Sequence, residues 1–149
     1  MNQMKTFDNY RVFKTLFAGR ELVVETGKTC ELSNGSCWVR YGETVVMANV
    51  TASVKPREGV DFFPLSVDYE ERLYSVGRIP GSFMKREGKA SDYEILISRL
   101  VDRALRPLFP EDFHLAVFVN IWLISAEKDI QPDALAGLAA SAALAASDI

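Results

Sequence analysis

Residues 91–124, SDYEILISRLVDRALRPLFPEDFHLAVFVNIWLI, contain a helix start, a helix body and a continuous apolar run. Ser91 and Glu94 match the capping box, in which the serine accepts the backbone N–H three residues on and the glutamate reaches back. We therefore predict an amphipathic helix from Ser91 to about Arg106, just before a proline. The apolar run from Leu115 to Ile124 predicts a central strand buried on both faces.

The residues before this stretch predict β-strands joined by turns. Apolar and β-branched runs predict four strands, at residues 22–26, 37–41, 44–51 and 61–65. Asn34-Gly35 and Gly42-Glu43 supply residues that accept a positive φ, so tight hairpins are expected at both places. Antiparallel pairing of neighbouring strands is the simplest topology for this half.

The end of the sequence predicts a second helix with an unusual composition. Pro132 opens it, and Asp133 to Ser147 is small and apolar on nearly every side. A helix without a polar face must be covered on every side, so we expect the chain to be a fragment. The whole pattern predicts one α+β domain over residues 1–149, with a β-α-β-α order, a mixed sheet with helices packed on it, and truncation at its C-terminal end.

The charge is distributed unevenly along the chain. The 149 residues are 48% hydrophobic and 25% charged, which is typical of a globular protein, and the net charge of −3 excludes a uniformly basic nucleic-acid binder. Residues 76–106 nevertheless carry seven basic against four acidic side chains, a net charge of +3, whereas residues 107–149 carry one against six. A local basic patch is therefore possible.

Two cysteines, Cys30 and Cys37, flank the expected Asn34-Gly35 turn. That register would place Cys30 nearer Val39, so a disulfide is not expected. Two cysteines and one distant histidine also fall short of a zinc site. Charged residues near the N-terminus leave no signal peptide, and no apolar stretch is long enough to span a membrane. We expect a cytoplasmic protein with no membrane contact.

The basic segment divides into a loop, residues 76–90, and a basic helix, residues 91–106. In the loop, Phe83 and Met84 stand among cations, a combination in which bases could stack while cations hold phosphates. Helical geometry aligns three arginines in one stripe, Arg99, Arg103 and Arg106. The opposite side of the helix carries Leu96, Leu100, Val101, Ala104 and Leu105. The same cations could instead form a solvated charged face, and the loop could serve an oligomer contact.

No catalytic or metal site is predicted. His114 is the only histidine and has apolar neighbours, so no nucleophilic triad forms. Asp61, Asp68, Glu70 and Glu71 cluster in sequence, but strand alternation would send successive carboxylates to opposite faces. A structural use of these carboxylates is the better prediction.

The segment VDYEERLYSVGRIPGSFMKREGKASDYEILISRLVDRALRPLFP, from Val67 to Pro110, closely resembles the polynucleotide phosphorylase family. The likeness extends over effectively the whole chain, which resembles the first ribonuclease-PH-like domain of that family. The resemblance implies phosphorolysis of RNA from the 3′ end with inorganic phosphate as co-substrate, in mRNA degradation. It also implies a homotrimer and Mg²⁺, with the phosphate- and metal-binding residues in a second ribonuclease-PH-like domain outside this chain.

By the same resemblance, the loop narrows a central channel around single-stranded RNA. The family typically has Phe-Phe-Arg-Arg where this sequence has Phe83-Met84-Lys85-Arg86, which keeps one aromatic ring and both charges. We expect Lys85, Arg86 and Lys89 to contact phosphates and Phe83 and Met84 to contact bases. The stripe of Arg99, Arg103 and Arg106 would then lie along the RNA path.

Two other functions are kept open. One is a single-domain ribonuclease PH that trims tRNA 3′ ends, although that family lacks the long Gly-Arg-Ile-Pro-Gly-Ser-Phe loop in this form. The other is a non-catalytic scaffold whose basic loop serves assembly. We expect the isolated 149-residue chain to be inactive, and its expected partners are single-stranded RNA, copies of itself and proteins of an RNA-degradation complex.

Overall fold

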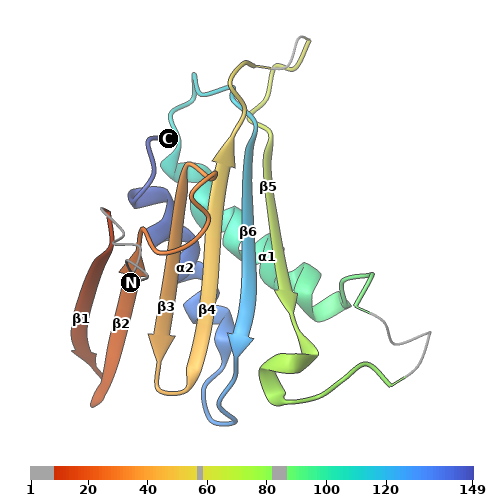
Figure 1. The fold of residues 1–149 in the computed structure, drawn as a ribbon. Helices are drawn as coiled ribbons and strands as arrows, with labels where there is room; N and C mark the ends of the chain where they lie inside the picture. Colours follow the sequence, from red (N-terminus) through yellow and green to blue (C-terminus); the bar gives the residue numbers. More distant parts are fainter. Residues whose placement is uncertain (1–8, 57–58, 82–86) are drawn as a thin grey trace, which may run out of the picture.

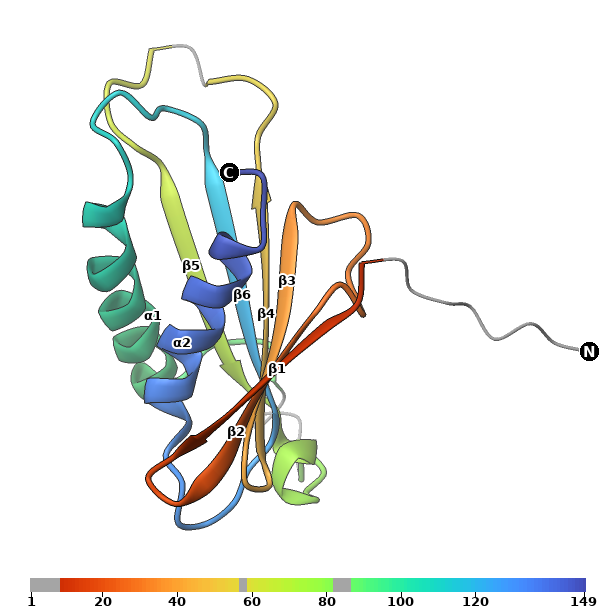
Figure 2. The ribbon, with the colours of Figure 1, turned by 90° about the vertical axis from the view of Figure 1, so that its left-hand side faces the viewer.

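The computed structural model describes residues 9–56, 59–81 and 87–149, which form one mixed sheet with two α-helices packed on one of its faces (Figures 1 and 2). The strand order is β1-β2-β3-β4-β6-β5, and only β5 and β6 run parallel. The strands are β1 (Arg11–Phe17), β2 (Arg20–Thr26), β3 (Gly35–Tyr41), β4 (Thr44–Ala52), β5 (Leu65–Glu71) and β6 (Val117–Ser125). The helices are α1 (Asp92–Leu105) and α2 (Pro132–Ala145), and they confirm the α+β prediction.

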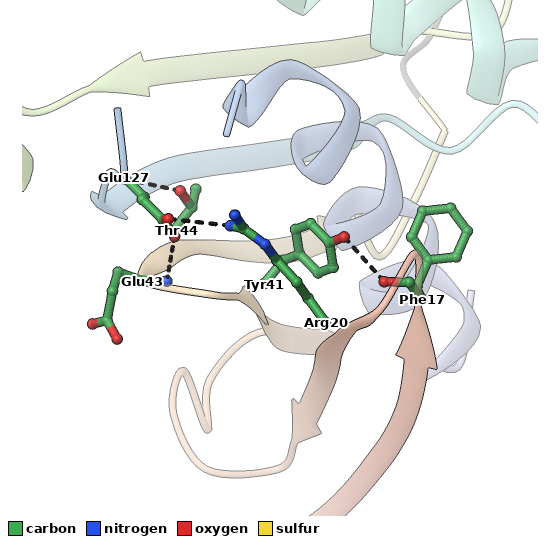
Figure 3. Close-up of polar contacts among 6 residues, drawn as sticks. All are labelled: Phe17, Arg20, Tyr41, Glu43, Thr44 and Glu127. Carbon is green, nitrogen blue, oxygen red and sulfur yellow. Dashed lines mark hydrogen bonds and ion pairs between the residues drawn. The ribbon is translucent and has the colours of Figure 1, made fainter. Parts of the chain in front are cut away.

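The β3–β4 hairpin forms where the sequence predicts it. Tyr41 pairs with Thr44, so Gly42-Glu43 is the two-residue turn, and Gly42 has a φ of +60°. Glu127, from the loop after β6, receives the Glu43 N–H at 3.1 Å and the Arg20 guanidinium at 3.1 Å (Figure 3). Its own N–H donates to the Thr44 hydroxyl at 3.0 Å. One side chain therefore ties the turns of two hairpins to the end of β6.

The predicted hairpin at Asn34-Gly35 is wrong. Thr26 pairs with Cys37, so residues 27–34 form a longer connection and Gly35 already belongs to β3. Asn34 is used elsewhere: its side chain accepts the Ala52 N–H at 2.9 Å and donates to Asp148 at 2.9 Å. Both cysteines are free, and Cys37 is fully buried, which raises the pKa of its thiol to about 12.

Two other strands differ from the prediction. The sequence pattern missed β1, because its apolar residues come in pairs, Val12-Phe13 and Leu16-Phe17, without the alternation that marks a half-buried strand; every residue of β1 is exposed. Its end is held where the Tyr41 hydroxyl donates to the Phe17 carbonyl at 3.0 Å (Figure 3). The strand expected at residues 61–65 begins only at Leu65, because Phe63 packs in a ring cluster with Phe109 and Phe113 instead of pairing in the sheet.

The second half of the chain builds a β5-α1-β6-α2 unit. β6 lies between β4 and β5, as expected of a central strand, but it is not buried on both faces. Val117, Val119, Ile121 and Leu123 are buried under the helices, whereas Phe118 and Trp122 face the uncovered side of the sheet. The alternation shows that helices cover a single face.

Helix α2 is only partly covered within the described residues. Its buried side, which faces the sheet, consists of Leu135, Ala136, Ala139, Ala140 and Ala143. Leu138 is 40% exposed, and the expected cover on every side is therefore not found in the part of the chain that the structure describes. Neither α1 nor α2 has the length and apolar character needed to cross a bilayer.

Helix α1 closes the β5 edge of the sheet with its side chains. The Glu71 N–H donates to Glu94 at 2.7 Å, and the Tyr69 N–H donates to the Ser98 hydroxyl at 2.9 Å. Arg106, just after the helix, donates to the Leu65 carbonyl at 3.4 Å. These residues are spaced by multiples of four, so they lie on one side of the helix and satisfy backbone groups that a neighbouring strand would otherwise pair.

Candidate nucleic-acid interface

The basic loop leaves the sheet at the end of β5. A short 3-10 helix, Leu73–Val76, ends at Gly77, which has a φ of +69°. Residues 77–81 and 87–90 belong to no helix or strand, in agreement with the predicted loop. Four predicted site residues, Phe83, Met84, Lys85 and Arg86, lie outside the described residues.

The C-terminal part of the loop is anchored at two points, and the first of these is Glu87. Its carboxylate accepts the Leu73 N–H at 2.5 Å and lies 3.6 Å from the Arg72 guanidinium. Arg72 also pairs with Glu70, and its guanidinium lies over the Trp122 ring at 5.4 Å. Glu87 therefore fastens the loop to a side chain that is itself packed on β6.

The second anchor point is the predicted capping box at Ser91, directly after the loop, which the structure confirms. Ser91 is the N-cap of α1, its hydroxyl accepts the Glu94 N–H, and Glu94 accepts the Ser91 N–H at 2.5 Å. The same carboxylate accepts the Glu71 N–H on β5. Burial opposes ionisation of Glu94, but the N–H donors of Ser91 and Glu71 outweigh it and lower its pKa.

Lys89 lies between these two anchors, two residues from each. It is exposed and forms no hydrogen bond or ion pair within residues 9–56, 59–81 and 87–149. It lines a cleft of about 580 Å³ together with Arg72, Glu94, Glu127 and Lys128. Five carboxylates line this cleft against three cations, so the cleft alone does not indicate an anion site.

The basic stripe on α1 is only partly as expected. Arg99 and Arg103 are exposed and have no ion pair with any described residue. The buried side of the helix is Ile97, Val101 and Leu105. The prediction placed Leu96, Leu100 and Ala104 opposite the arginine stripe together with Val101 and Leu105, but these three are exposed, because the side that meets the sheet is centred on Val101 and they lie away from it.

Arg106 is in a different position from the other two arginines. Its guanidinium donates to both carboxylate oxygens of Asp102 and to the carbonyls of Phe63 and Leu65. These four bonds use four of the five N–H donors of the guanidinium, so one donor has no partner among the described residues. Its contact with Phe63 also places the guanidinium 5.7 Å from the ring centroid.

Two of the four clustered acidic residues, Glu70 and Glu71, have structural partners. Glu70 pairs with Arg72, and Glu71 accepts the Tyr69 hydroxyl at 2.9 Å, on the opposite face of β5. The described residues contain no group of three or more potential ligands that could hold a metal ion. His114 is exposed.

Sequence reasoning missed Glu87, which anchors the loop. A signal was available, because Glu87 is the only carboxylate in residues 76–90, among Arg78, Lys85, Arg86 and Lys89. A lone acid among cations is a candidate for an internal partner. Its actual partners, Arg72 and the Leu73 N–H, lie 14 to 15 positions away, and no local pattern indicates them.

Comparison with known proteins gives consistent matches. The family model described as 3′ exoribonuclease family, domain 1, matches residues 18–149. A polyribonucleotide nucleotidyltransferase of Clostridioides difficile (strain 630) is 58% identical over 140 residues, which are 94% of this chain and 20% of that protein. One from Parabacteroides distasonis is 60% identical over 131 residues, 88% of this chain and 18% of that protein.

Among solved structures, a chain of the Archaeoglobus fulgidus exosome with RNA bound to the active site superposes with a TM-score of 0.65 and 22% identity. The match covers 96% of this chain and 54% of that chain, and it supports the fold. The chain spans about a fifth of the length of the curated relatives that it matches.

Proposed function

Because the chain belongs to the 3′ exoribonuclease family, as its domain 1, we propose that it works within a phosphate-dependent enzyme that degrades RNA from the 3′ end. In that reaction a phosphate oxygen attacks the phosphorus of the terminal phosphodiester. The P–O bond to the shortened strand breaks, and a nucleoside diphosphate leaves. The observation that carries this proposal is the identity of 58–60% with polyribonucleotide nucleotidyltransferases over about nine-tenths of the chain.

The reacting groups are proposed to lie outside this chain. The described residues contain neither a cluster suited to a metal ion nor a histidine paired with a nucleophile, and a second domain of the same fold is the proposed source of the phosphate- and Mg²⁺-binding residues. The present domain would contribute RNA contacts and assembly into a homotrimer. Degradation of mRNA and a cytoplasmic location stay predictions.

The proposed RNA contacts are sequence-independent. Cations would hold phosphates and the apolar residues would contact bases, through Phe83, Met84, Lys85, Arg86, Lys89, Arg99, Arg103 and Arg106. The exposed, unpaired state of Lys89, Arg99 and Arg103 among the described residues supports this assignment. Arg106 would contribute through its one remaining N–H donor. An enzyme that releases and grips each nucleotide in turn needs contacts that do not depend on base identity.

A role in assembly alone is the second candidate. Tyr93, Leu96 and Leu100 form an exposed apolar flank on α1, at 46%, 64% and 61% exposure, and an interface with another subunit would cover them. Under this alternative, the neighbouring arginines would not contact RNA. Trimming of tRNA ends by a single-domain enzyme is less well supported, because the similar proteins are about five times as long as this chain.

Nucleoside diphosphate release tests the proposed function. We expect the full-length protein that contains this chain to release nucleoside diphosphates from single-stranded RNA only when inorganic phosphate is present. The 149-residue chain alone should release none. Release of nucleoside monophosphates, or release of diphosphates without inorganic phosphate, would contradict phosphorolysis. Release of diphosphates by the isolated chain would contradict the proposal that the reacting groups lie outside it.

A further inference from the structure

The backbone on both sides of Lys89 is held by carboxylates that bind the end of β5 and the 3-10 helix after it. Glu87 accepts the Leu73 N–H at 2.5 Å, and Glu94 accepts the Ser91 N–H at 2.5 Å together with the Glu71 N–H at 2.7 Å. The backbone on either side of Lys89 is therefore fixed to Glu71, the last residue of β5, and to Leu73, the first residue of the 3-10 helix that follows. The lysine side chain itself has no partner among the described residues.

The anchor for Glu87 is a rigid one. Arg72 lies over the Trp122 ring at 5.4 Å and pairs with Glu70, so its guanidinium is held on the sheet. The side chains of Arg72 and Glu87 are 24% and 28% exposed, so water screens their attraction less than it does for a surface pair.

We propose that Glu87 is a positioning residue for RNA binding, because it fixes the backbone from which Lys89 presents its ammonium to a phosphodiester. The proposal rests on the proposed function. Glu87 does not itself touch RNA, since its carboxylate is turned to Arg72 and Leu73 and would repel a phosphate. A fixed backbone reduces the entropy that the lysine loses when it binds.

The two contacts of Glu87 can be separated chemically. A glutamine keeps an oxygen that accepts the Leu73 N–H but loses the charge that pairs with Arg72, whereas an alanine loses both. The hydrogen bond from Leu73 is 2.5 Å long, whereas the Arg72 guanidinium lies 3.6 Å away, so we expect the hydrogen bond to be the main hold and Glu87→Gln to retain most of the function that Glu87→Ala loses.

A double-mutant cycle on the full-length protein tests the coupling of Glu87 to Lys89. Affinity for a single-stranded oligoadenylate is measured for Glu87→Ala, Lys89→Ala and the double variant, with Glu111→Ala as an exposed acidic control. We expect each single change to weaken binding about fivefold. The double variant should also bind only about fivefold more weakly than wild type, because the effects of coupled residues are not additive. Additive losses of about 25-fold, or unchanged affinity in Glu87→Ala, would overturn the proposal.

Hydrogen exchange at the Leu73 amide gives a readout that is independent of RNA. Exchange should quicken in Glu87→Ala and stay slow in Glu87→Gln, and Glu87→Gln should bind RNA within about twofold of wild type. Equal exchange in wild type and Glu87→Ala would overturn the anchor. If Lys89→Ala binds RNA like wild type, the proposed RNA contact of Lys89 fails together with this proposal. Additive losses with a weakened Lys89→Ala overturn this proposal and leave the RNA contact of Lys89 standing.

Discussion

Gly35 lets helix α2 approach strand β3 closely. A Cβ at this position would lie against the carbonyl oxygen of Ala143 and 2.8 Å from the Cβ of Ser147. Both neighbours belong to the end of α2 and the turn after it, and one of them is backbone. The glycine is therefore required by packing between a helix and the sheet, not by a turn.

Gly35→Ala should destabilise the protein by about 1–3 kcal/mol, because the added methyl overpacks the contact with α2. Gly137→Ala is the matched control: it lies within α2 with nothing within 4 Å of its added Cβ, and it should stabilise by about 0.5–1 kcal/mol. Urea denaturation of both variants measures the free energy of unfolding. A neutral Gly35→Ala would show that α2 does not sit against β3 as described.

Glu94 carries a pH dependence of known sign. Burial raises its pKa and hydrogen bonds from backbone N–H groups lower it, with a net lowering. The folded state thus favours the carboxylate, and its stabilising contribution is present above the ordinary pKa of glutamate and is lost as pH falls through the lowered value.

Glu94→Gln should therefore reduce the free energy of unfolding at neutral pH by more than it does at acidic pH, since glutamine does not titrate. Denaturation of wild type and variant at a series of pH values checks this. A difference between them that stays constant, or grows on acidification, would contradict the assigned hydrogen bonds.

At the scale of elements, α1 does two things with two sets of residues. Glu94, Ser98 and Arg106 cap the outward backbone groups of β5. Arg99 and Arg103 are exposed and pair with no described residue. The helix thus protects a sheet edge and presents cations to solvent at the same time.

Substituting Arg103 and Arg106 separately distinguishes these roles. Arg106→Ala should cost about 1 kcal/mol of stability, because it removes hydrogen bonds to Asp102 and to two carbonyls that water can partly replace. Arg103→Ala should leave stability within about 0.5 kcal/mol and weaken RNA binding. Thermal unfolding and RNA titration of the two variants give the comparison. Equal losses of stability would contradict the claim that Arg106 has a structural role that Arg103 lacks.

How far the sequence predicts each element depends on how local its cause is. The capping box of Ser91 and Glu94 and the Gly42-Glu43 turn depend on neighbours within a few residues, and both are confirmed. The position of Asn34 is set by hydrogen bonds to Ala52 and Asp148. Its predicted placement in a tight turn is wrong because both partners lie far away in the sequence, where no local pattern indicates them.

The candidate site divides in the same way. Counting charges along the sequence is enough to select Lys89, Arg99 and Arg103 as candidate RNA contacts, because an exposed cation can be predicted without knowledge of any partner residue. The structural use of Arg106 depends on carbonyls more than 40 positions away, and that of Glu87 on Arg72. Contacts between distant segments are thus what sequence patterns leave out.

On the scale of the whole molecule, an acidic protein carries one basic region. The net charge is −3, but residues 76–106 carry +3 and fall on the loop and on α1. Concentrating the cations on one region would attract RNA there while the rest of the surface repels it. The proposed function therefore has this region grip the RNA backbone while the reaction takes place elsewhere in a longer enzyme.

The salt dependence of RNA affinity tests this proposed grip most directly. It is measured on the full-length protein with single-stranded RNA, for wild type and for the triple variant Lys85→Ala, Arg86→Ala, Lys89→Ala. Each phosphate contact adds about 0.7 to the magnitude of the slope of log affinity against log salt, so the slope should fall by about 2 in the variant. A variant with the wild-type slope and affinity would contradict the claim that this domain holds RNA by its phosphates.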